Sequence, residues 1–335
     1  MDFRLTPDQL ELQEHVRRYC AREFTLERLA AMDGTGIDRA GWASLADLGL
    51  FAIRVPEAEG GLGLGWVETT AAYEVLGYHL VPGPLVWSQL LAGIVPGVAD
   101  GSVVVTGLAD ADEGAPLLVE HLDLADGVAL LVVADPDGGD DADGGVVLMD
   151  AVCDPAAPAL TPFDPLTPVA VLGAVEEAEW VLDPDSAEAV LAAGAVLTGA
   201  LLTGIADRAL DAAREYALGR EQFDRPIAAF QAVQHILADM YVRTMLARSA
   251  AYAAAAVLDD PDAGDLAAAV GSVKVVAGEA AMANARACIQ VHGGMGFTWE
   301  MIPHYLLKRT WVLEQSFGTS TEHAEALAAA WGSPE

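Results

Sequence analysis

The sequence predicts a mainly α-helical protein with a small β-sheet domain in the middle of the chain. Hydrophobic residues recur at helical spacing through both ends of the chain, whereas short runs rich in valine and leucine gather in the middle. A change from helices to strands and back again predicts separate regions. The expected domains are an N-terminal helical domain (residues 1–101), a shortened β-sheet domain (102–184) and a C-terminal four-helix bundle (185–335).

The composition is that of a globular protein with a strongly acidic surface. The chain has 335 residues, of which 53% are hydrophobic, and this is enough for a substantial core. Its net charge of −33 argues against nucleic acids and anionic membranes as partners. The three cysteines are far apart, which excludes a paired metal-ligand motif and fits a reducing cytosol. Because the N-terminal residues lack the apolar segment of a signal peptide, a cytoplasmic location is expected.

The N-terminal region contains three helical stretches and a glycine-rich turn. Thr6 suits the N-cap of the first helix, and Pro7 fits the first helical position, where its missing N–H has no partner to lose. The glycines between residues 60 and 65 match neither dinucleotide-binding nor phosphate-loop spacing, and Glu57 and Glu59 beside them repel phosphate. A structural turn is therefore expected there. The expected helices are residues 5–24, 39–49 and 66–97, the last broken at Pro82-Gly83-Pro84.

Short β-type runs define the middle region. An acidic segment, residues 135–145, separates two of these runs. It lacks the closing glutamate of an EF-hand loop, so we expect a solvated hairpin rather than a calcium site. The expected strands lie at residues 103–106, 128–134 and 146–149, and residues 180–182 are expected to end the sheet.

From about residue 186 the pattern is helical to the end of the chain. Residues 189–205 carry no charge, but this run is short for a membrane span and has no aromatic or basic anchors. We therefore expect a buried helix. The expected helices are residues 186–219, 227–258, 263–292, 300–314 and 320–331.

A turn between two of these helices presents an arginine and an aromatic ring together. Arg220 and Phe223 lie in a short polar segment, and Pro226 is expected to restart the helix. A second turn follows His292, where consecutive glycines let the backbone approach another chain or a ligand closely.

Several motifs, taken together in their order and spacing, resemble the acyl-CoA dehydrogenase family. They are Arg220-Glu-Gln-Phe-Asp-Arg-Pro-Ile, Gln290-Val-His-Gly-Gly-Met-Gly-Phe and Gly318-Thr-Ser, with Val55-Pro-Glu-Ala-Glu-Gly-Gly-Leu-Gly near the N-terminus. The resemblance is strongest over residues 195–330 and implies the family's fold. It also implies α,β-dehydrogenation of an acyl-CoA thioester, in which a glutamate removes the α-proton and the β-hydrogen leaves as hydride to a flavin.

The resemblance implies FAD as the cofactor, shared with a neighbouring subunit. An arginine fork suits phosphate oxygens, and a glycine lets backbone N–H groups approach a ligand. For Arg220 the alternative is a surface ion pair with Glu221 or Asp224. No metal ligands are expected. The residues expected to bind FAD are Arg220, Gln222, Phe223, Gln290, Gly293, Gly294 and Thr319.

Both positions at which the family carries its base lack a carboxylate in this chain. Phe317 occupies the usual position, and Gly194 occupies the alternative position near the start of the helix that leads to Arg220. Neither residue accepts a proton, so no catalytic residue is assigned. The segments with which the family's middle domain grips flavin and substrate are also missing between residues 102 and 183. The nearby carboxylates are expected to be surface or capping charges; they are Glu300, Glu314 and Glu322.

These departures favour a non-catalytic subunit of a heteromeric acyl-CoA dehydrogenase, inactive alone and assembled as an α2β2 heterotetramer. A catalytic partner subunit is expected to supply the base and most of the acyl-CoA site, while this chain completes the FAD site across the interface. By resemblance to actinobacterial enzymes, the expected substrate is a steroid or cholesterol side-chain CoA thioester, and the expected electron acceptor is an electron-transfer flavoprotein. Two alternatives stay open: a self-sufficient homotetrameric acyl-CoA dehydrogenase with a displaced base such as Glu314, and a cofactor-free structural assembly protein.

Overall fold

The chain forms two compact units in a computed structural model that describes residues 5–109, 116–132, 145–174 and 178–332. The division of the sequence into three domains, with boundaries near residues 101 and 184, stays a prediction. The helical unit comprises residues 1–30, 66–81 and 195–335, and the sheet unit comprises residues 31–65 and 82–194.

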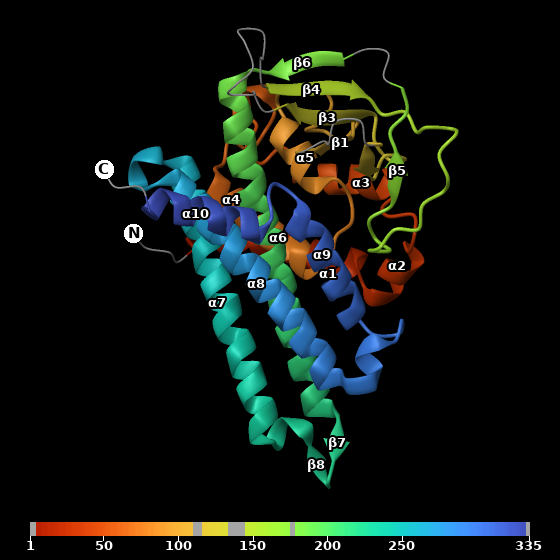
Figure 1. The fold of residues 1–335 in the computed structure, drawn as a ribbon, viewed down its shortest axis with the longest axis vertical. Helices are drawn as coiled ribbons and strands as arrows, with labels where there is room; N and C mark the ends of the chain where they lie inside the picture. Colours follow the sequence, from red (N-terminus) through yellow and green to blue (C-terminus); the bar gives the residue numbers. More distant parts are fainter. Residues whose placement is uncertain (1–4, 110–115, 133–144, 175–177, 333–335) are drawn as a thin grey trace. The chain divides into compact units, whose positions relative to one another are not determined.

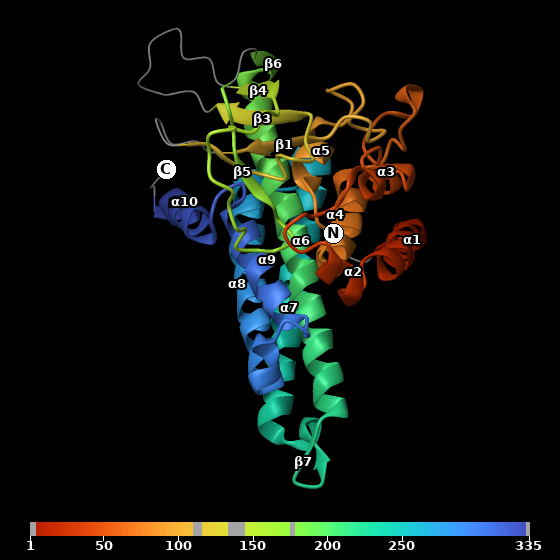
Figure 2. The ribbon, with the colours of Figure 1, turned by 90° about the vertical axis from the view of Figure 1, so that its right-hand side faces the viewer.

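Three long helices run side by side in the helical unit, and both ribbon views show them (Figures 1 and 2). They are tied at one level by the buried Asn284 on α8, whose amide donates to the carbonyl oxygens of Ala206 on α6 and Met240 on α7. The helices of this unit are α1 (Pro7–Glu23), α2 (Leu26–Ala31), α4 (Trp66–Tyr78), α6 (Pro184–Gly219, in this unit from residue 195), α7 (Gln231–Asp259), α8 (Leu266–His292), α9 (Pro303–Gln315) and α10 (Ser320–Gly332).

Helices α4 and α6 touch each other backbone to backbone. A Cβ atom added at Gly77 on α4 would lie 2.0 Å from the carbonyl oxygen of Leu201 on α6, far inside van der Waals contact. A Cβ atom at Gly204 on α6 would lie 2.0 Å from the carbonyl oxygen of Glu74 on α4. Each helix therefore places a glycine where the other helix crosses it, because no other residue leaves room for the main chain there.

A buried ionic network surrounds this crossing. The carboxylate of Glu74 on α4 is within 2.7 Å of the guanidinium group of Arg248 on α7 and accepts a hydrogen bond of 2.7 Å from the Tyr252 hydroxyl. Arg248 also reaches Asp207 on α6 at 2.8 Å. Because Glu74 is only 4% exposed, its charge requires these partners, and removal of one would leave a buried charge uncompensated. The network thus holds α4, α6 and α7 in one arrangement.

The sheet unit contains a four-stranded sheet in the order β1-β3-β4-β6. The pair β1–β3 is parallel, whereas β3–β4 and β4–β6 are antiparallel. A second, two-stranded sheet is formed by β2 and β5. The strands are β1 (Val105–Leu108), β2 (Leu118–Glu120), β3 (Gly127–Val132), β4 (Gly145–Asp150), β5 (Val169–Val171) and β6 (Ala178–Leu182), and the helices of this unit are α3 (Arg39–Asp47) and α5 (Leu85–Leu91).

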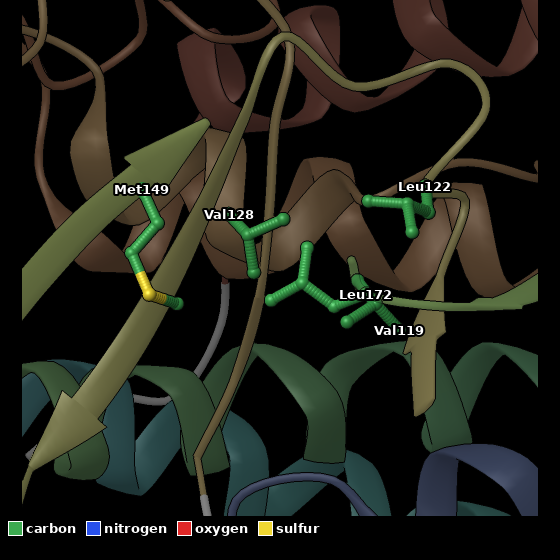
Figure 3. Close-up of a cluster of buried hydrophobic side chains, with 5 residues drawn as sticks. All are labelled: Val119, Leu122, Val128, Met149 and Leu172. Atoms are coloured by element: carbon green, nitrogen blue, oxygen red, sulfur yellow. The ribbon is translucent and has the colours of Figure 1, made fainter. Parts of the chain in front are cut away.

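A hydrophobic cluster joins the two sheets, as Figure 3 shows. Side chains from β2 and the turn after it meet side chains from β3, β4 and the end of β5. Burial of branched and flexible apolar side chains stabilises such short strands, which cannot persist on their backbone hydrogen bonds alone. The cluster consists of Val119, Leu122, Val128, Met149 and Leu172.

Most elements expected from the sequence are confirmed, within a few residues at their ends. The capping box at Thr6 is present, since its side chain accepts from the Gln9 N–H while Gln9 returns a bond to the Thr6 N–H. The glycine-rich segment is a turn, and a Cβ at Gly61 would lie 2.0 Å from the Val55 carbonyl oxygen. The expectation for Pro226 was wrong, because this proline belongs to a short strand and α7 begins only at Gln231.

Some expectations lie outside the described residues, and some elements had no expectation. The acidic segment 135–145 is described only at Gly145, the first residue of β4. The unexpected elements are short: α2, β2 and β5 each span six residues or fewer. Such lengths leave too few residues for a periodic pattern to appear.

Two described helices are long and apolar enough to match a membrane span by length and composition. One is α6 over residues 186–219, where 83% of the most apolar window is buried within the protein. The other covers α8 and the turn after it, residues 266–297, where 44% of the window is buried. The uncharged run 189–205 in α6 is thus a mostly buried helix, as expected from its sequence.

We predict that Gly204→Ala lowers the free energy of unfolding by about 3 kcal/mol or more, at the upper end of overpacking effects. The added methyl group meets the backbone of α4, which cannot move aside as a side chain can. Urea denaturation followed by circular dichroism measures the change. Gly219→Ala is the matched control, because a Cβ there has nothing within 4 Å. Equal stability of the two variants would contradict the backbone contact.

Candidate functional site

The predicted corner at Arg220 is a tight β-hairpin between α6 and α7. Strands β7 (Glu221–Gln222) and β8 (Arg225–Pro226) pair through a two-residue loop. Both loop residues have positive φ, +52° at Phe223 and +63° at Asp224. Such a loop normally carries asparagine and glycine, because other residues are strained in the left-handed region. Since Phe223 is 85% exposed, packing within this chain does not account for that strain.

The tip of the hairpin combines aromatic rings with cationic groups. The Phe223 ring meets the Phe230 ring edge to face, with 6.1 Å between centroids, and the Arg225 guanidinium lies 4.1 Å from the Phe230 centroid. Arg220 is tied through its backbone only, since its N–H donates to Tyr216 and its carbonyl oxygen accepts from Ile227. The contacts stabilise the tip and leave the Arg220 side chain exposed.

The alternative of a surface ion pair for Arg220 is not observed. Within residues 178–332, which the structure describes without a gap, its guanidinium group is in no salt bridge and no side-chain hydrogen bond. Glu221 and Asp224 are neighbours in sequence, but the hairpin does not bring either carboxylate within ion-pair distance. The guanidinium group is therefore available to an anion that is not part of this chain.

The glycine turn after α8 lies at the same end of the helical unit as the hairpin (Figure 1). Tyr216, one turn before Arg220 on α6, stacks on His292 at the end of α8, with 4.2 Å between ring centroids. His292 is fixed in turn, because its Nδ1 atom lies 2.8 Å from the Cys288 carbonyl oxygen. Burial lowers the pKa of His292, so the neutral ring is favoured in this stack. These contacts bring the Arg220 and Gln290 segments together.

Packing within the chain does not explain two of the glycines in this turn, Gly293 and Gly294. Gly293 has φ +60°, which favours glycine, but Gly294 has no such constraint, and a Cβ at either position meets nothing within 4 Å. Gly296 differs, since a Cβ there would lie 2.8 Å from the Ile289 carbonyl oxygen. Gln290 is exposed beside the turn. The open space at Gly294 fits a group from outside the chain that comes close to the backbone.

The turn between α9 and α10 contains the first base position and is closed. The Phe317 side chain is 4% exposed and its φ is +55°, so a buried phenylalanine is held in the left-handed region. His323 Nε2 donates to the Phe317 carbonyl oxygen at 2.9 Å. Thr319 forms a capping box with Glu322: the Thr319 N–H donates to the Glu322 carboxylate, and the Glu322 N–H donates to the Thr319 hydroxyl.

A fully buried lysine holds this turn from α8. The ammonium group of Lys274 donates to the carbonyl oxygens of Leu313, Glu314 and Ser316 at 3.4, 3.3 and 2.8 Å. These carbonyls lie at the end of α9 and just after it, where Leu313 also accepts from the Ser316 N–H, and a cation there meets the negative end of the helix dipole. Burial lowers the pKa of Lys274 from 10.5 to about 8, although Glu314 and Glu322 act in the opposite direction.

Neither Glu314 nor Gly194 offers a free carboxylate that could act as the base. Glu314 Oε1 accepts a hydrogen bond of 2.7 Å from the Ser320 N–H, and its Oε2 accepts from Gln315. Its carboxylate thus caps α10, as expected for a local structural charge. Gly194 is buried within α6 and offers no side chain. Among the described residues there is no group of three or more His, Cys, Asp or Glu that could hold a metal ion.

The predicted site residues fall into two separate groups. Arg220, Gln222 and Phe223 lie on the hairpin at the same end as the turn that carries the glycines and Gln290. Phe317 and Thr319 form the second group, in the turn whose residues Ser316 and Ser320 are hydrogen-bonded to Lys274. Lys274 and Gln290 are 16 residues apart on α8, so about 24 Å of helix separates the groups. Within one copy of this chain, the two groups are therefore too far apart to bind the same phosphate group.

Sequence reasoning missed several residues that shape these groups. Arg225 and Phe230 belong to the motifs but were not assigned to the site, because only the folded hairpin brings them together. The stack of Tyr216 on His292 joins segments far apart in the sequence. Lys274 did carry a signal, since it is a single charge within the apolar run Val273-Lys274-Val275-Val276. A charge that interrupts a buried helical face predicts a specific partner.

We predict that Lys274 makes stability rise with pH between about 8 and 10.5. In that window the unfolded chain keeps the lysine proton while the folded chain has lost it, so the unfolded state binds more protons. Relative to Lys274→Met, the wild-type protein should gain about 3 kcal/mol of unfolding free energy across the window. Urea titrations at several pH values measure this difference.

The chain's other lysine is the control for this prediction. Lys308 lies over the Trp299 ring on the protein surface rather than inside the core. Lys308→Met is therefore the same substitution outside the core, and its urea titrations are compared with those of Lys274→Met. If Lys274→Met and wild type follow parallel curves from pH 8 to 10.5, Lys274 does not titrate in this range.

Two family models match the chain on either side of its sheet region. The acyl-CoA dehydrogenase N-terminal domain matches residues 6–99, and the acyl-CoA dehydrogenase C-terminal domain matches residues 185–331. The second match contains both residue groups described above, and the two matches together include helices α1–α10 except for Pro184 and Gly332.

Curated relatives lie in the same family. The chain is 34% identical over 275 residues to acyl-CoA dehydrogenase FadE34 of Mycobacterium tuberculosis, with 80% of this chain but only 38% of that protein covered. It is 32% identical over 318 residues to acyl-CoA dehydrogenase IpdE2 of the same organism, with 92% of each chain covered. The chain thus spans less than half of FadE34 and nearly the whole of IpdE2.

Solved structures agree with the sequence relatives. A chain of the ChsE4-ChsE5 complex from Mycobacterium tuberculosis matches with a TM-score of 0.86 and 25% identity, and the match covers 100% of both chains. A chain of the Tcur3481-Tcur3483 steroid ACAD, a G363A variant, matches with a TM-score of 0.79 and 26% identity over 96% of this chain and 97% of that one. The motifs, the fold and a relative matched over nearly its full length agree: the chain belongs to the acyl-CoA dehydrogenase family of oxidoreductases.

Proposed function

We propose that this chain is the non-catalytic subunit of a heteromeric, FAD-dependent acyl-CoA dehydrogenase and that it completes the FAD site of a catalytic partner. The observation that carries the proposal is the turn at Phe317. The residue at the family's base position is an apolar side chain, buried and held by hydrogen bonds on both sides.

The reaction requires a carboxylate that can take the α-proton from the substrate. Phe317 has no group that accepts a proton, and Gly194 has no side chain. Glu314 is occupied as a cap of α10. The alternative of a self-sufficient enzyme with a displaced base at Glu314 therefore lacks support in the geometry. The base must come from another chain if the complex is to dehydrogenate an acyl-CoA.

The hairpin and the glycine turn fit a nucleotide cofactor from outside the chain. When bound, FAD accepts the hydride that leaves the β-carbon of the substrate. Arg220 has a free guanidinium group for pyrophosphate oxygens, and the space at Gly294 admits a group close to the backbone. Gln222 and Gln290 are exposed amides, and Phe223 is an exposed ring beside them. Every one of these groups faces outward, as a shared site requires.

The relatives support a heteromeric assembly and a steroid substrate. One structural neighbour is a complex of two different chains, ChsE4 and ChsE5, and another is a steroid acyl-CoA dehydrogenase, Tcur3481-Tcur3483. On this basis we propose an α2β2 complex in the cytoplasm that acts on a steroid side-chain CoA thioester. The partner holds most of the acyl-CoA, and an electron-transfer flavoprotein takes the electrons.

The first test of this function is the flavin content of the complex. The chain is purified alone and together with a candidate catalytic acyl-CoA dehydrogenase subunit from the same genome, and bound flavin is measured by absorbance. We expect one FAD per heterodimer. Arg220→Ala should weaken FAD binding about 10- to 100-fold, as for loss of a hydrogen bond to a charged group. Arg18→Ala on α1 is the control, because Arg18 is exposed and lies outside both residue groups.

The outcomes separate the three functions. A yellow and active protein from this chain alone would favour a self-sufficient enzyme. A colourless protein, even with its partner, would favour a structural assembly protein without cofactor. Unchanged flavin binding in Arg220→Ala would remove the hairpin from the site.

The second test restores a carboxylate at the base position. Phe317→Glu should not give the isolated chain any acyl-CoA dehydrogenase activity, because the missing flavin and substrate segments are not restored with it. Burial of a carboxylate there should also destabilise the turn by several kcal/mol. Activity is assayed with steroid and fatty acyl-CoA substrates and an artificial electron acceptor. Turnover by Phe317→Glu alone would show that this chain builds a complete active site.

A further inference from the structure

A cavity of about 270 Å³ lies in the helical unit, away from both residue groups. It forms where the end of α1 and the start of α2 face the end of α4, the middle of α6 and the residue before α9. Arg208, which lines it, precedes Arg220 by 12 residues on α6, or about 18 Å of helix. The apolar part of its wall consists of Ala21, Phe24, Leu26, Leu29 and Ile302.

The polar side of the cavity carries positive charge around Tyr78. The guanidinium groups of Arg17 and Arg208 lie 5.5 and 5.3 Å from the centre of the Tyr78 ring. Arg208 also donates to the Tyr78 hydroxyl at 3.4 Å. The same hydroxyl donates a hydrogen bond of 2.9 Å to the carboxylate of Asp211. Tyr78 thus lies between Arg208 and Asp211, and one negative charge faces the two arginines here.

Neither arginine forms a salt bridge with a carboxylate in the described part of the chain. This is unexpected for a protein with 50 acidic and only 17 basic residues. Two guanidinium groups near one ring repel each other, and partial burial weakens the screening of that repulsion by water. A charge of opposite sign between them and the apolar wall would relieve it.

His79 adds a second polar group to the same wall. Burial and then the charges of Arg208 and Arg17 lower its pKa to about 4, so the ring is neutral at physiological pH. Its Nε2 atom is buried and has no hydrogen-bond partner among the described residues. An unsatisfied buried polar atom costs free energy that a bound ligand could recover.

We propose that this cavity binds a small organic anion, a carboxylate on a compact apolar body. The apolar wall takes the hydrocarbon part, and Arg208 takes the carboxylate beside Tyr78. At about 30 Å³ for each water-sized group, the cavity holds on the order of nine non-hydrogen atoms. This site is independent of the FAD role proposed above, because it shares none of its residues.

Cyclohexanecarboxylate, with nine non-hydrogen atoms, is the probe that tests the site. Isothermal titration of the full-length chain should give a Kd of about 1 mM or lower, a reasonable affinity for so small a ligand. Cyclohexanecarboxamide has the same shape without the charge and should bind at least tenfold more weakly. Cyclohexylmethylamine carries the opposite charge and should not bind.

Three variants locate the binding within the protein. Arg208→Gln should weaken carboxylate binding at least tenfold. Ala21→Trp fills the cavity from an exposed position on α1 and should abolish binding while Arg208 stays in place. Arg18→Gln changes an exposed arginine next to Arg17 and should have no effect.

Each contrary result overturns the proposal. No heat of binding at 10 mM carboxylate, equal binding of the carboxamide, or unchanged binding in Ala21→Trp would each do so. If Arg208→Gln does not fold, Ala21→Trp and the carboxamide still decide the outcome, because neither removes a partner of Tyr78.

Discussion

The contact between the backbones of α4 and α6 is the constraint on which the helical unit depends. Gly77 and Gly204 allow the two helices to cross without side chains between them. This close crossing brings Glu74 to the level of Asp207 and Arg248, where the three charges can share hydrogen bonds inside the protein. The position of α6 then determines where its end delivers the hairpin and where Arg208 meets Tyr78. The two glycines therefore determine where charged side chains elsewhere on these helices come together.

The helices could be predicted because their signals are local and repeat over many residues. Thr6 and the long apolar periodicities of α6, α7 and α8 each point to one structure. The short strands β2 and β5 could not be predicted, since three residues hold no period and their stability comes from the cluster around Val119 and Leu172. The prediction that Pro226 starts a helix failed because it, too, depended on contacts that the local sequence does not show. Proline fits a helix start and an edge strand equally well, and only the pairing of β7 with β8 decides between them.

The candidate site shows the same division between local and distant information. The order of the motifs could select Arg220, Gln290 and Thr319 as candidates, because family resemblance is a property of the sequence itself. It could not tell that about 24 Å of α8 separates the turn at Thr319 from Gln290, nor that Arg220 has no carboxylate within reach. Both facts depend on how the helices pack. The turn at Phe317 adds a further point, because hydrogen bonds from His323 and Lys274 hold the backbone around a side chain that cannot accept a proton.

The exposed hairpin has a consequence for how the chain behaves in solution. Phe223 at its tip and Phe297 in the glycine turn are 85% and 75% exposed, and both are aromatic groups that water solvates poorly. Exposed aromatic side chains at this end of the helical unit promote self-association of the protein. The net charge of −33 opposes that, because each added copy brings the same repulsion. The net charge therefore disfavours contact of this end with a second copy of the chain, although its aromatic rings are exposed.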